Sequence, residues 1–471
     1  MGREWKEVTL GELFNVKHGF AFKGEHFTDK PTKTVCVTPG NFSIGGGFKK
    51  PKPKYYDGPV SEEYILQPGD IIVTMTDLSK QADTLGLAAS IPDDGIVWLH
   101  NQRIGLLKFK TTHACHPEFI NYLLRTHGYR SWVVGSATGT TVKHTSPSRI
   151  HSYSCFIPAY EEQRRIANVL GALDDKIELN RQINTTLESM TQALFKSWFV
   201  DFDPVIDNAF ASGNRIPDEL QAKAQRRAAL GALHQPLPAE IRQIFPASFV
   251  FDEDMGWLPE GWGSEKLAKV ISLIIDHRGK TPTKMGGKWS DSGYPAISAK
   301  NVKDGKIIRE DAIKYVDKEL YKKWMKEPLK IGDVALTSEA PMGELFLFSS
   351  SVEYVLSQRL FAIRANPEFI SGSYLYFWLN TSVAKSDMKN RSTGTTVVGI
   401  RQSELQKVKV LTPGLEAVLA FDKYAGPMLQ SVDKTEQEIS SLIKVRDSLL
   451  PKLLSGQIQV PEFEQQLAEV I

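Results

Sequence analysis

Residues 159–200 read AYEEQRRIANVLGALDDKIELNRQINTTLESMTQALFKSWFV and contain no proline. Apolar side chains recur along this run at spacings of three, four or their sums: Ile166, Leu170, Leu173, Ile177, Leu187, Leu194 and Trp198. That spacing predicts an α-helix with one apolar face and a charged face opposite. At 1.5 Å per residue the helix would extend for about 60 Å, further than a domain of this size is wide. We therefore expect it to pack lengthwise against a partner helix, as in a coiled coil.

A second run, which follows Pro413, has the same rhythm and is the expected partner. Its inner face is formed by Phe421, Ala425, Met428, Val432, Thr435, Ile439, Leu442 and Leu449. We expect the two helices to pack antiparallel, so that they cover each other's apolar faces. The tetrapeptide AGPM at 425–428 should break or kink the second helix and leave a main segment near 427–454. Asn180 lies where the first stripe passes; a buried position would fix the register, but a solvated edge is the expected environment.

Outside the two helices, the sequence occurs twice. The pentapeptide TGTTV stands at 138–142 and again at 393–397. Other pairs are PGDIIVT (68–74) with IGDVALT (331–337), NQR (101–103) with SQR (357–359), and HPEFI (116–120) with NPEFI (366–370). The pairs keep one order and a separation of about 255 residues, which indicates a tandem duplication.

Each copy contains short β-like runs, such as GDIIVTM and RLFAIRA, with helix-like stretches between them. The predicted fold class is α+β: a tandem duplication of two mixed α/β domains separated by two long antiparallel, coiled-coil-like helices, with pseudo-twofold symmetry. The expected boundaries are globular domains at 1–157 and 257–412, helical spacers at 158–202 and 413–456, a linker at 203–256 and a C-terminal tail at 457–471. One short helix is expected in the linker, at 217–233.

Composition limits the function classes. The chain has 471 residues, enough for two or more domains, and a net charge of only +2, so any basic surface must be local. Basic residues concentrate at 266–288 and in KKPKPK at 49–54. Three cysteines cannot form a disulfide framework and suit a reducing compartment. No apolar run approaches the ~18 residues of a membrane span, so we expect a cytoplasmic protein with no membrane partner.

Sequence motifs for catalysis and cofactors are incomplete. RGKT at 278–281 resembles the end of a phosphate-binding loop, but Ile274 stands where that loop requires glycine. HACH at 113–116 has no second ligand pair at zinc spacing. DFDPV at 201–205 lacks the second proline of the aminomethyltransferase element, and GxSxG is absent. The sequence therefore predicts no catalytic residue, no metal site and no cofactor in this chain.

Residues 157–205, from IPAYEEQRRI to DFDPV, resemble the central conserved region of the specificity subunit of type I restriction–modification enzymes. The paired GD, QR and TGTT elements and DHRGKTP at 276–282 resemble its target-recognition domains. The resemblance covers essentially the whole chain. One departure is GLEAVLA at 414–420, where the family usually has an element like EEQRRI at 161–166, so the two spacers are expected to dock a partner unequally.

The resemblance implies a non-catalytic subunit that recognises double-stranded DNA. The implied partners are two modification (methyltransferase) subunits, which carry S-adenosylmethionine, and restriction/translocase subunits, which use ATP and Mg²⁺. Two recognition domains on a stiff spacer can read two short sequences about one helical turn apart, and diverged domains make the target asymmetric. The alternatives are a duplicated protein-binding scaffold without DNA readout, and a DNA-modifying enzyme in its own right.

Basic residues near the repeated motifs are the candidate DNA contacts, since Lys and Arg bind phosphates and a subset reaches base edges. They are Lys143, His144, Arg278, Lys280, Lys284, Arg401, Lys49, Lys50, Lys300 and Lys303. The candidates for the spacer and for subunit docking are Glu161, Gln163, Ile166, Leu170, Leu173, Ile177, Val432, Ile439 and Leu442. We expect the glycine of TGTT to shape a loop, in preference to a role of the motif in contacting bases.

Overall fold

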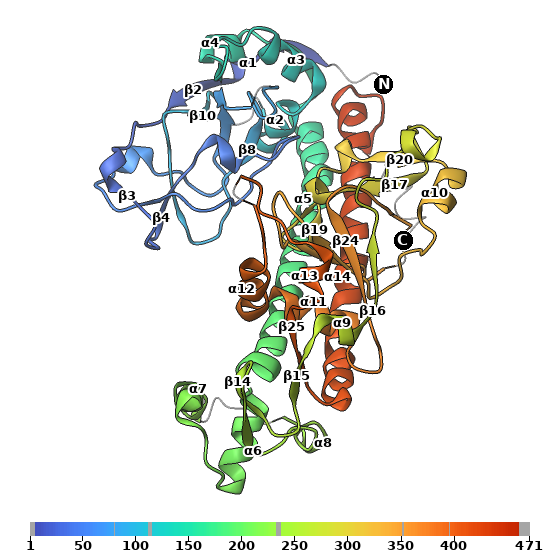
Figure 1. Ribbon diagram of the computed structural model, residues 1–471. Helices are drawn as coiled ribbons and strands as arrows, with labels where there is room; N and C mark the ends of the chain where they lie inside the picture. Colours follow the sequence, from blue (N-terminus) through green and yellow to red (C-terminus); the bar gives the residue numbers. More distant parts are fainter. Residues whose placement is uncertain are drawn as a thin grey trace. The chain divides into compact units, whose positions relative to one another are not determined.

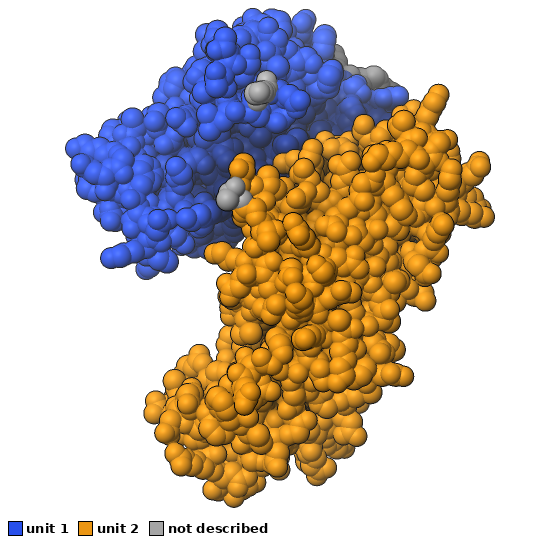
Figure 2. Space-filling view, viewed as in Figure 1, with its two compact units in different colours: residues 1–179, 438–471 blue, residues 180–437 orange. Residues whose placement is uncertain are grey.

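A computed structural model describes residues 5–79, 81–111, 115–231, 237–350, 353–394 and 396–460. The chain divides into two compact units, which are coloured separately in Figure 2. Unit 1 comprises residues 1–179 and 438–471, and unit 2 comprises residues 180–437. Two long helices, α5 (Tyr160–Phe195) and α14 (Leu415–Leu454), each contribute one part to unit 1 and the other part to unit 2.

The main sheet of unit 1 has four antiparallel strands in the order β2-β10-β6-β8. These strands are β2 (Phe14–His18), β10 (Ile104–Phe109), β6 (Ile71–Thr74) and β8 (Ala88–Ser90). The predicted β run at 69–75 forms the buried strand β6, as its β-branched residues favour. A second sheet joins β3 (Phe27–Thr28), β5 (Tyr55–Tyr56), β4 (Thr34–Cys36) and β9 (Val97–Leu99).

Three helices complete the globular part of unit 1: α2 (Pro117–Leu123), α3 (His127–Gly135) and α4 (Pro147–His151). The short helix α1 (Leu10–Leu13) follows strand β1 (Lys6–Thr9). Strand β1 pairs with β12 (Ser154–Ile157), the last strand before α5. One apolar core joins α1, α2 and the sheet to Ile166 and Leu170 of α5 and to Leu449 and Leu453 of α14.

Unit 2 repeats this plan. Its main sheet has the order β16-β24-β21-β22, again antiparallel throughout. The strands are β16 (Ile271–Asp276), β24 (Leu360–Ala365), β21 (Val334–Thr337) and β22 (Leu345–Leu347). Strand β15 (Gly263–Lys266) pairs with β25 (Lys409–Thr412), and α9 (Leu267–Val270) follows β15 as α1 follows β1. The predicted duplication is therefore confirmed in the fold of the two units (Figure 1).

Three helices of unit 2 correspond to α2, α3 and α4: α11 (Gly372–Asn380), α12 (Ser382–Asn390) and α13 (Gln402–Leu405). Unit 2 also contains a small sheet of β20 (Lys314–Val316), β17 (Tyr294–Ile297) and β23 (Val355–Leu356), beside α10 (Lys318–Trp324). A hairpin joins β18 (Val302–Lys303) to β19 (Lys306–Ile307).

The segment between α5 and the second repeat packs into unit 2. It contains α6 (Asp203–Ser212), α7 (Gln221–Ala228), α8 (Ala239–Arg242) and the hairpin of β13 (Phe249–Asp252) and β14 (Gly256–Pro259). Arg227 of α7 forms a two-point ion pair with Asp207 of α6, at 2.9 and 2.6 Å. The helix expected at 217–233 is shorter in the structure, a 3₁₀ turn at Asp218–Leu220 followed by α7; residues 232 and 233 lie outside the described part.

The two long helices pack antiparallel, as predicted. In unit 1, Asp174 of α5 bonds Arg446 of α14 at 2.7 Å, and Lys176 pairs with Glu438 at 3.4 Å. In unit 2, Asn184 donates to Glu436 at 3.0 Å, and the Thr191 hydroxyl lies 3.4 Å from the sulfur of Met428. Within each unit the numbers of the α14 partners fall as those of α5 rise, which defines antiparallel packing.

The expected break at AGPM is wrong, because α14 runs without interruption through Gly426 and Pro427 (Figure 1). A proline inside a helix costs about 3 kcal/mol. Phe421, Ala425 and Val418, all with no exposed surface, lie on the buried face around it. Each large apolar side chain buried there contributes about 1.5–3 kcal/mol, so packing offsets the lost hydrogen bond.

The buried stripe of α5 contains polar residues. Asn180, Asn184 and Thr191 are at most 2% exposed and continue the spacing set by Ile177. The solvated edge expected for Asn180 is therefore wrong. A search for apolar residues cannot find such positions, since burial here follows helical position and not residue type.

Candidate nucleic-acid interface

The TGTTV pentapeptide lies in a loop that the same backbone bridge closes in both units. Thr395 of the second copy lies outside the described residues. In unit 1 it lies between α3 and β11 (Lys143–His144), and Thr138 and His144 exchange backbone hydrogen bonds of 3.0 and 2.9 Å. In unit 2, Thr393 and Gly399 do the same at 2.8 and 3.0 Å.

The glycine of each loop is required by the backbone. Gly139 has φ +92°, and a Cβ there would lie 2.0 Å from the carbonyl oxygen of Val142. Gly394 has φ +111°, and its Cβ would lie 2.1 Å from the oxygen of Val397. Only glycine adopts such a conformation without strain. The repeated motif therefore preserves a loop shape, which was the expected role.

Strand β11 presents two of the candidate DNA contacts. It pairs with β7 (Thr76–Asp77), where Lys143 is opposite Asp77 and His144 is opposite Thr76. His144 is exposed, and its Nδ1 lies 3.2 Å from the Thr76 hydroxyl. Burial acts to raise the pKa of Asp77, but hydrogen bonds from Ser79 and Thr84 outweigh it and lower that pKa. Asp77 is thus a charged anchor of the β7 turn.

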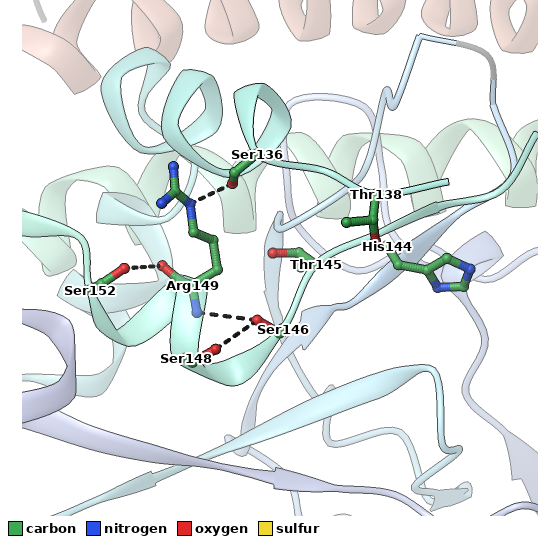
Figure 3. Close-up of a pocket in the computed structure, with 8 residues that line it drawn as sticks. All are labelled: Ser136, Thr138, His144, Thr145, Ser146, Ser148, Arg149 and Ser152. Carbon is green, nitrogen blue, oxygen red and sulfur yellow. Dashed lines mark hydrogen bonds between the residues drawn. The ribbon is translucent and has the colours of Figure 1, made fainter. Parts of the chain in front are cut away.

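A cavity of about 480 Å³ opens beside this loop (Figure 3). Hydroxyl groups, one imidazole and one guanidinium line it, and none of the lining side chains is acidic. They are Ser136, Thr138, His144, Thr145, Ser146, Ser148, Arg149 and Ser152. Arg149 and the serines were not predicted from the sequence. The pattern that could have indicated them is the cluster of hydroxyl residues around one arginine in HTSPSRIHS at 144–152.

In unit 2, the DHRGKTP segment follows strand β16 and carries three candidates. Arg278 forms a two-point contact with Asp276, at 2.9 and 2.7 Å, and its guanidinium lies 4.3 Å from the ring centre of Phe361. Lys280 donates to the Trp324 carbonyl at 3.2 Å. Lys284 donates to the Gly279 carbonyl at 3.1 Å. The loop is therefore tied to the sheet and to α10 through its own basic residues.

His277, between these basic residues, is a buried neutral group. It is 7% exposed, and burial lowers its pKa to about 4, with a further lowering from the Lys280 charge. It cannot supply positive charge to a nucleic acid near pH 7.

The remaining candidates occupy other segments. Lys300 and Lys303 are exposed at the 3₁₀ turn Ala299–Asn301 and on β18, and Arg401 is the exposed N-cap residue of α13. Lys49 and Lys50 are also exposed, and Lys50 pairs with Asp94 at 3.0 Å.

The two repeats also share a capping box at equivalent 3₁₀ turns. Thr38 and Asn41 form a capping box in unit 1, as Ser298 and Asn301 do in unit 2. The sequence comparison missed this pair, because the two segments share little beyond a hydroxyl residue and an asparagine three positions later.

Most of the apolar spacer candidates are buried or half-buried. Ile166, Leu170 and Ile177 are at most 2% exposed, Ile439 is buried, and Leu173, Val432 and Leu442 are half-buried.

The two polar spacer candidates lie in different environments. Gln163 is 1% exposed; its amide donates to the Pro158 carbonyl at 2.8 Å and accepts from the His116 backbone at 2.8 Å. These two bonds hold the start of α5. Glu161 is exposed and pairs with Arg164 at 2.7 Å.

The described ranges hold no group of three or more His, Cys, Asp or Glu side chains placed to bind a metal ion. Of the HACH cluster, His113 lies outside the described residues, and Cys115 is buried with its pKa raised by burial to about 11. Among the described residues, no helix has both the length and the apolar composition that crossing a membrane requires.

Comparison with known proteins agrees with this architecture. Residues 2–189 and 259–445 match the family described as the type I restriction modification DNA specificity domain, once for each repeat. The chain is 31% identical over 479 residues to the type I restriction enzyme HindI specificity subunit of Haemophilus influenzae, covering 97% of this chain and 100% of that one. It is 19% identical to the EcoBI specificity subunit of Escherichia coli, covering 96% and 86% of the two chains.

Among solved structures, the S subunit of a type I restriction–modification system from M. genitalium has the same fold. Its TM-score is 0.55 at 15% identity, with 96% of both chains covered. The double family match, the full-length relative and the shared fold lead to one conclusion: this chain belongs to the family of DNA specificity subunits of type I restriction–modification enzymes.

Proposed function

We propose that the two repeats each read one half of a bipartite, asymmetric target in double-stranded DNA. The readers are the target-recognition domains at residues 1–157 and 257–412, and the segments 158–202 and 413–456 are the spacers. The observation that carries this proposal is the shared strand order of the two main sheets, combined with different side chains beside the two TGTT loops. A conserved scaffold with diverged loops suits two readers of different sequences, because loops carry binding specificity.

The basic candidates then divide by environment. Exposed residues without an acidic partner among the described side chains, such as Lys300 and Arg401, are suited to phosphate contacts. Arg278 is oriented by Asp276 and by the Phe361 ring, so it is suited to bidentate contact with a guanine edge. Lys143 and His144, with Lys49 and Lys50, would act in the first half-site, and Lys280, Lys284 and Lys303 in the second.

We also propose that the long helices hold the partner subunits. Two modification subunits would carry S-adenosylmethionine, and restriction/translocase subunits would use ATP and Mg²⁺, so this chain supplies recognition and no chemistry. Ile183 and Met190 of α5, 40% and 50% exposed, are seven residues apart on the same face of the helix and are suited to apolar contact with a partner. Genomic DNA as the target places the complex in the cytoplasm.

Two measurements test the function. Mapping methylated adenines in DNA modified by the assembled complex should give one asymmetric site with two defined parts and a fixed gap. The full chain should bind duplex DNA with strong salt dependence, whereas a protein-binding scaffold would not. Methyl transfer by the isolated chain would contradict the non-catalytic assignment.

A further inference from the structure

We propose that the cavity beside the first TGTT loop is a phosphate-binding pocket that holds one backbone phosphate of the DNA duplex. The inference rests on the proposed function. It adds a phosphate contact by a residue that is not among the basic candidates named from the sequence. Its central residue is Arg149, on helix α4.

The guanidinium of Arg149 is held in place from two sides. Its carbon lies 3.9 Å from the ring centre of Trp132, and its Nε donates to the hydroxyl of Ser136. Among the described residues, neither terminal nitrogen has a hydrogen-bond partner. A half-buried guanidinium that is fixed through Nε and keeps its terminal N–H groups free matches the bidentate geometry of a phosphate.

The surrounding groups also suit an oxyanion. The Thr145 hydroxyl oxygen is buried and has no hydrogen-bond partner among the described residues, although it lines the cavity. Leaving a buried hydroxyl unpaired is costly, so a ligand that accepts its proton would relieve that cost. Ser148 is exposed at the cavity, with its hydroxyl 2.9 Å from that of Ser146, and offers a further donor. The Ser152 hydroxyl already donates to the Arg149 carbonyl at 3.0 Å. Figure 3 shows Thr145, Ser148 and Ser152 around the backbone of Arg149, whose guanidinium extends toward Ser136, with His144 and Thr138 farther to one side.

A purely structural role for Arg149 explains less of this arrangement. Stacking on Trp132 and bonding to Ser136 would hold α4 against α3, but these contacts use neither the terminal nitrogens nor Thr145. The phosphate pocket accounts for both.

The second repeat serves as an internal control. Helices α3 and α12 have nine residues each, and each precedes a TGTT loop that is closed by an equivalent backbone bridge. At the position of Arg149 the second repeat has Glu404, whose carboxylate accepts from Lys407 at 2.7 Å. At the positions of Trp132 and Ser136 it has Asp387 and Arg391, which pair at 2.7 Å. At these described positions, the second repeat therefore has no counterpart of the Arg149 guanidinium or of the Trp132 ring.

The test uses the full chain and a duplex of random sequence, with affinity measured over a range of salt concentrations. Arg149→Ala should weaken binding about tenfold and lower the salt slope by about one unit, because one phosphate contact is lost. Arg149→Lys, which keeps the charge, should retain the slope.

A second pair of variants guards against loss of folding. Ser148 is exposed in the first turn of α4, where an acidic residue favours the helix. Ser148→Asp should therefore preserve the fold while repelling a phosphate, and should weaken binding about tenfold. Ser148→Asn, of the same shape without the charge, should stay within about twofold of the unmodified chain.

The outcomes separate the two proposals. If the unmodified chain binds duplex DNA with salt dependence but the Arg149 and Ser148 variants match it, the pocket is refuted and the proposed function stands. If the unmodified chain shows no salt-dependent DNA binding, the proposed function itself fails. A calorimetric titration with inorganic phosphate distinguishes a free anion: phosphate binding that Arg149→Ala abolishes, with unchanged DNA affinity, would refute a backbone contact.

Discussion

The two repeats share a backbone but differ in the charges beside the same loop. Gly139 and Gly394 adopt the same left-handed conformation, and the bridges at Thr138 and Thr393 close the same turn. Next to these turns, unit 1 places Arg149 on a polar cavity, while unit 2 places Glu404 in an ion pair. The duplication thus preserved the residues that shape the backbone and changed those that face outward. That is the pattern expected when one scaffold must recognise two different ligands.

The strongest challenge to this comparison is exchange of a whole repeat. Replacing residues 1–157 with the corresponding domain of a relative should change one half-site completely and leave the other half-site and the gap unchanged. Specific sites are typically bound ~10³–10⁷-fold tighter than other DNA, so the switch should be unambiguous in methylation mapping. A chimera in which both half-sites change would show that the repeats do not read independently.

The seam between the long helices gives a second comparison, between the buried apolar Ile177 in unit 1 and the buried polar Thr191 in unit 2. Ile177→Asp would bury an uncompensated charge at a position that is 2% exposed, and should cost about 3–5 kcal/mol of unfolding free energy. Thr191→Val removes a fully buried hydroxyl that bonds within its own helix, to the Leu187 carbonyl, and should cost less than about 1.5 kcal/mol. Denaturant unfolding measures both, and Ile177→Val is the control. Equal losses for Ile177→Asp and Thr191→Val would show that the seam does not distinguish a buried apolar position from a buried polar one.

The shared loop shape is tested by the two glycines. Gly139→Ala and Gly394→Ala each place a Cβ within 2.1 Å of a carbonyl oxygen, so the loop must move. Each substitution should cost about 1–3 kcal/mol in the local conformation. Because each loop serves one reader, Gly139→Ala should impair discrimination at one half-site and Gly394→Ala at the other. Binding to variant duplexes measures this, and identical effects on both half-sites would show that the loops are only structural.

The smallest expected effect comes from converting the second repeat toward the first. Glu404→Arg removes the carboxylate that pairs with Lys407 and adds a cation beside the second TGTT loop. Affinity for duplexes of any sequence should rise and the salt slope should steepen by about one unit. Glu404→Gln, which only frees Lys407, should give a smaller change. A neutral or negative effect of Glu404→Arg would place this surface away from the DNA.

Much of the architecture follows from local patterns that the chain repeats. The spacing from Ile166 to Trp198 predicted α5, and its counterpart after Pro413 predicted an antiparallel partner, because helical periodicity is a local property of the sequence. The matched segments around GDIIVT and GDVALT predicted the duplicated sheet for the same reason. The site was harder to predict from the sequence. Lys143, His144 and Arg401 were predicted because they lie next to the repeated motif, whereas Arg149 was not predicted.

The sequence alone thus determined the duplication, the two long helices and the family. The tertiary structure decided which residues are available for function. It kept α14 continuous through Pro427 because the core around Phe421 outweighs one lost hydrogen bond. It buried Asn180 and Gln163, it stacked Arg149 on the ring of Trp132, and it brought Ser136 and Arg149 together at one cavity. Each of these outcomes depends on contacts between segments distant in the chain, whose free energies add up only when the segments meet.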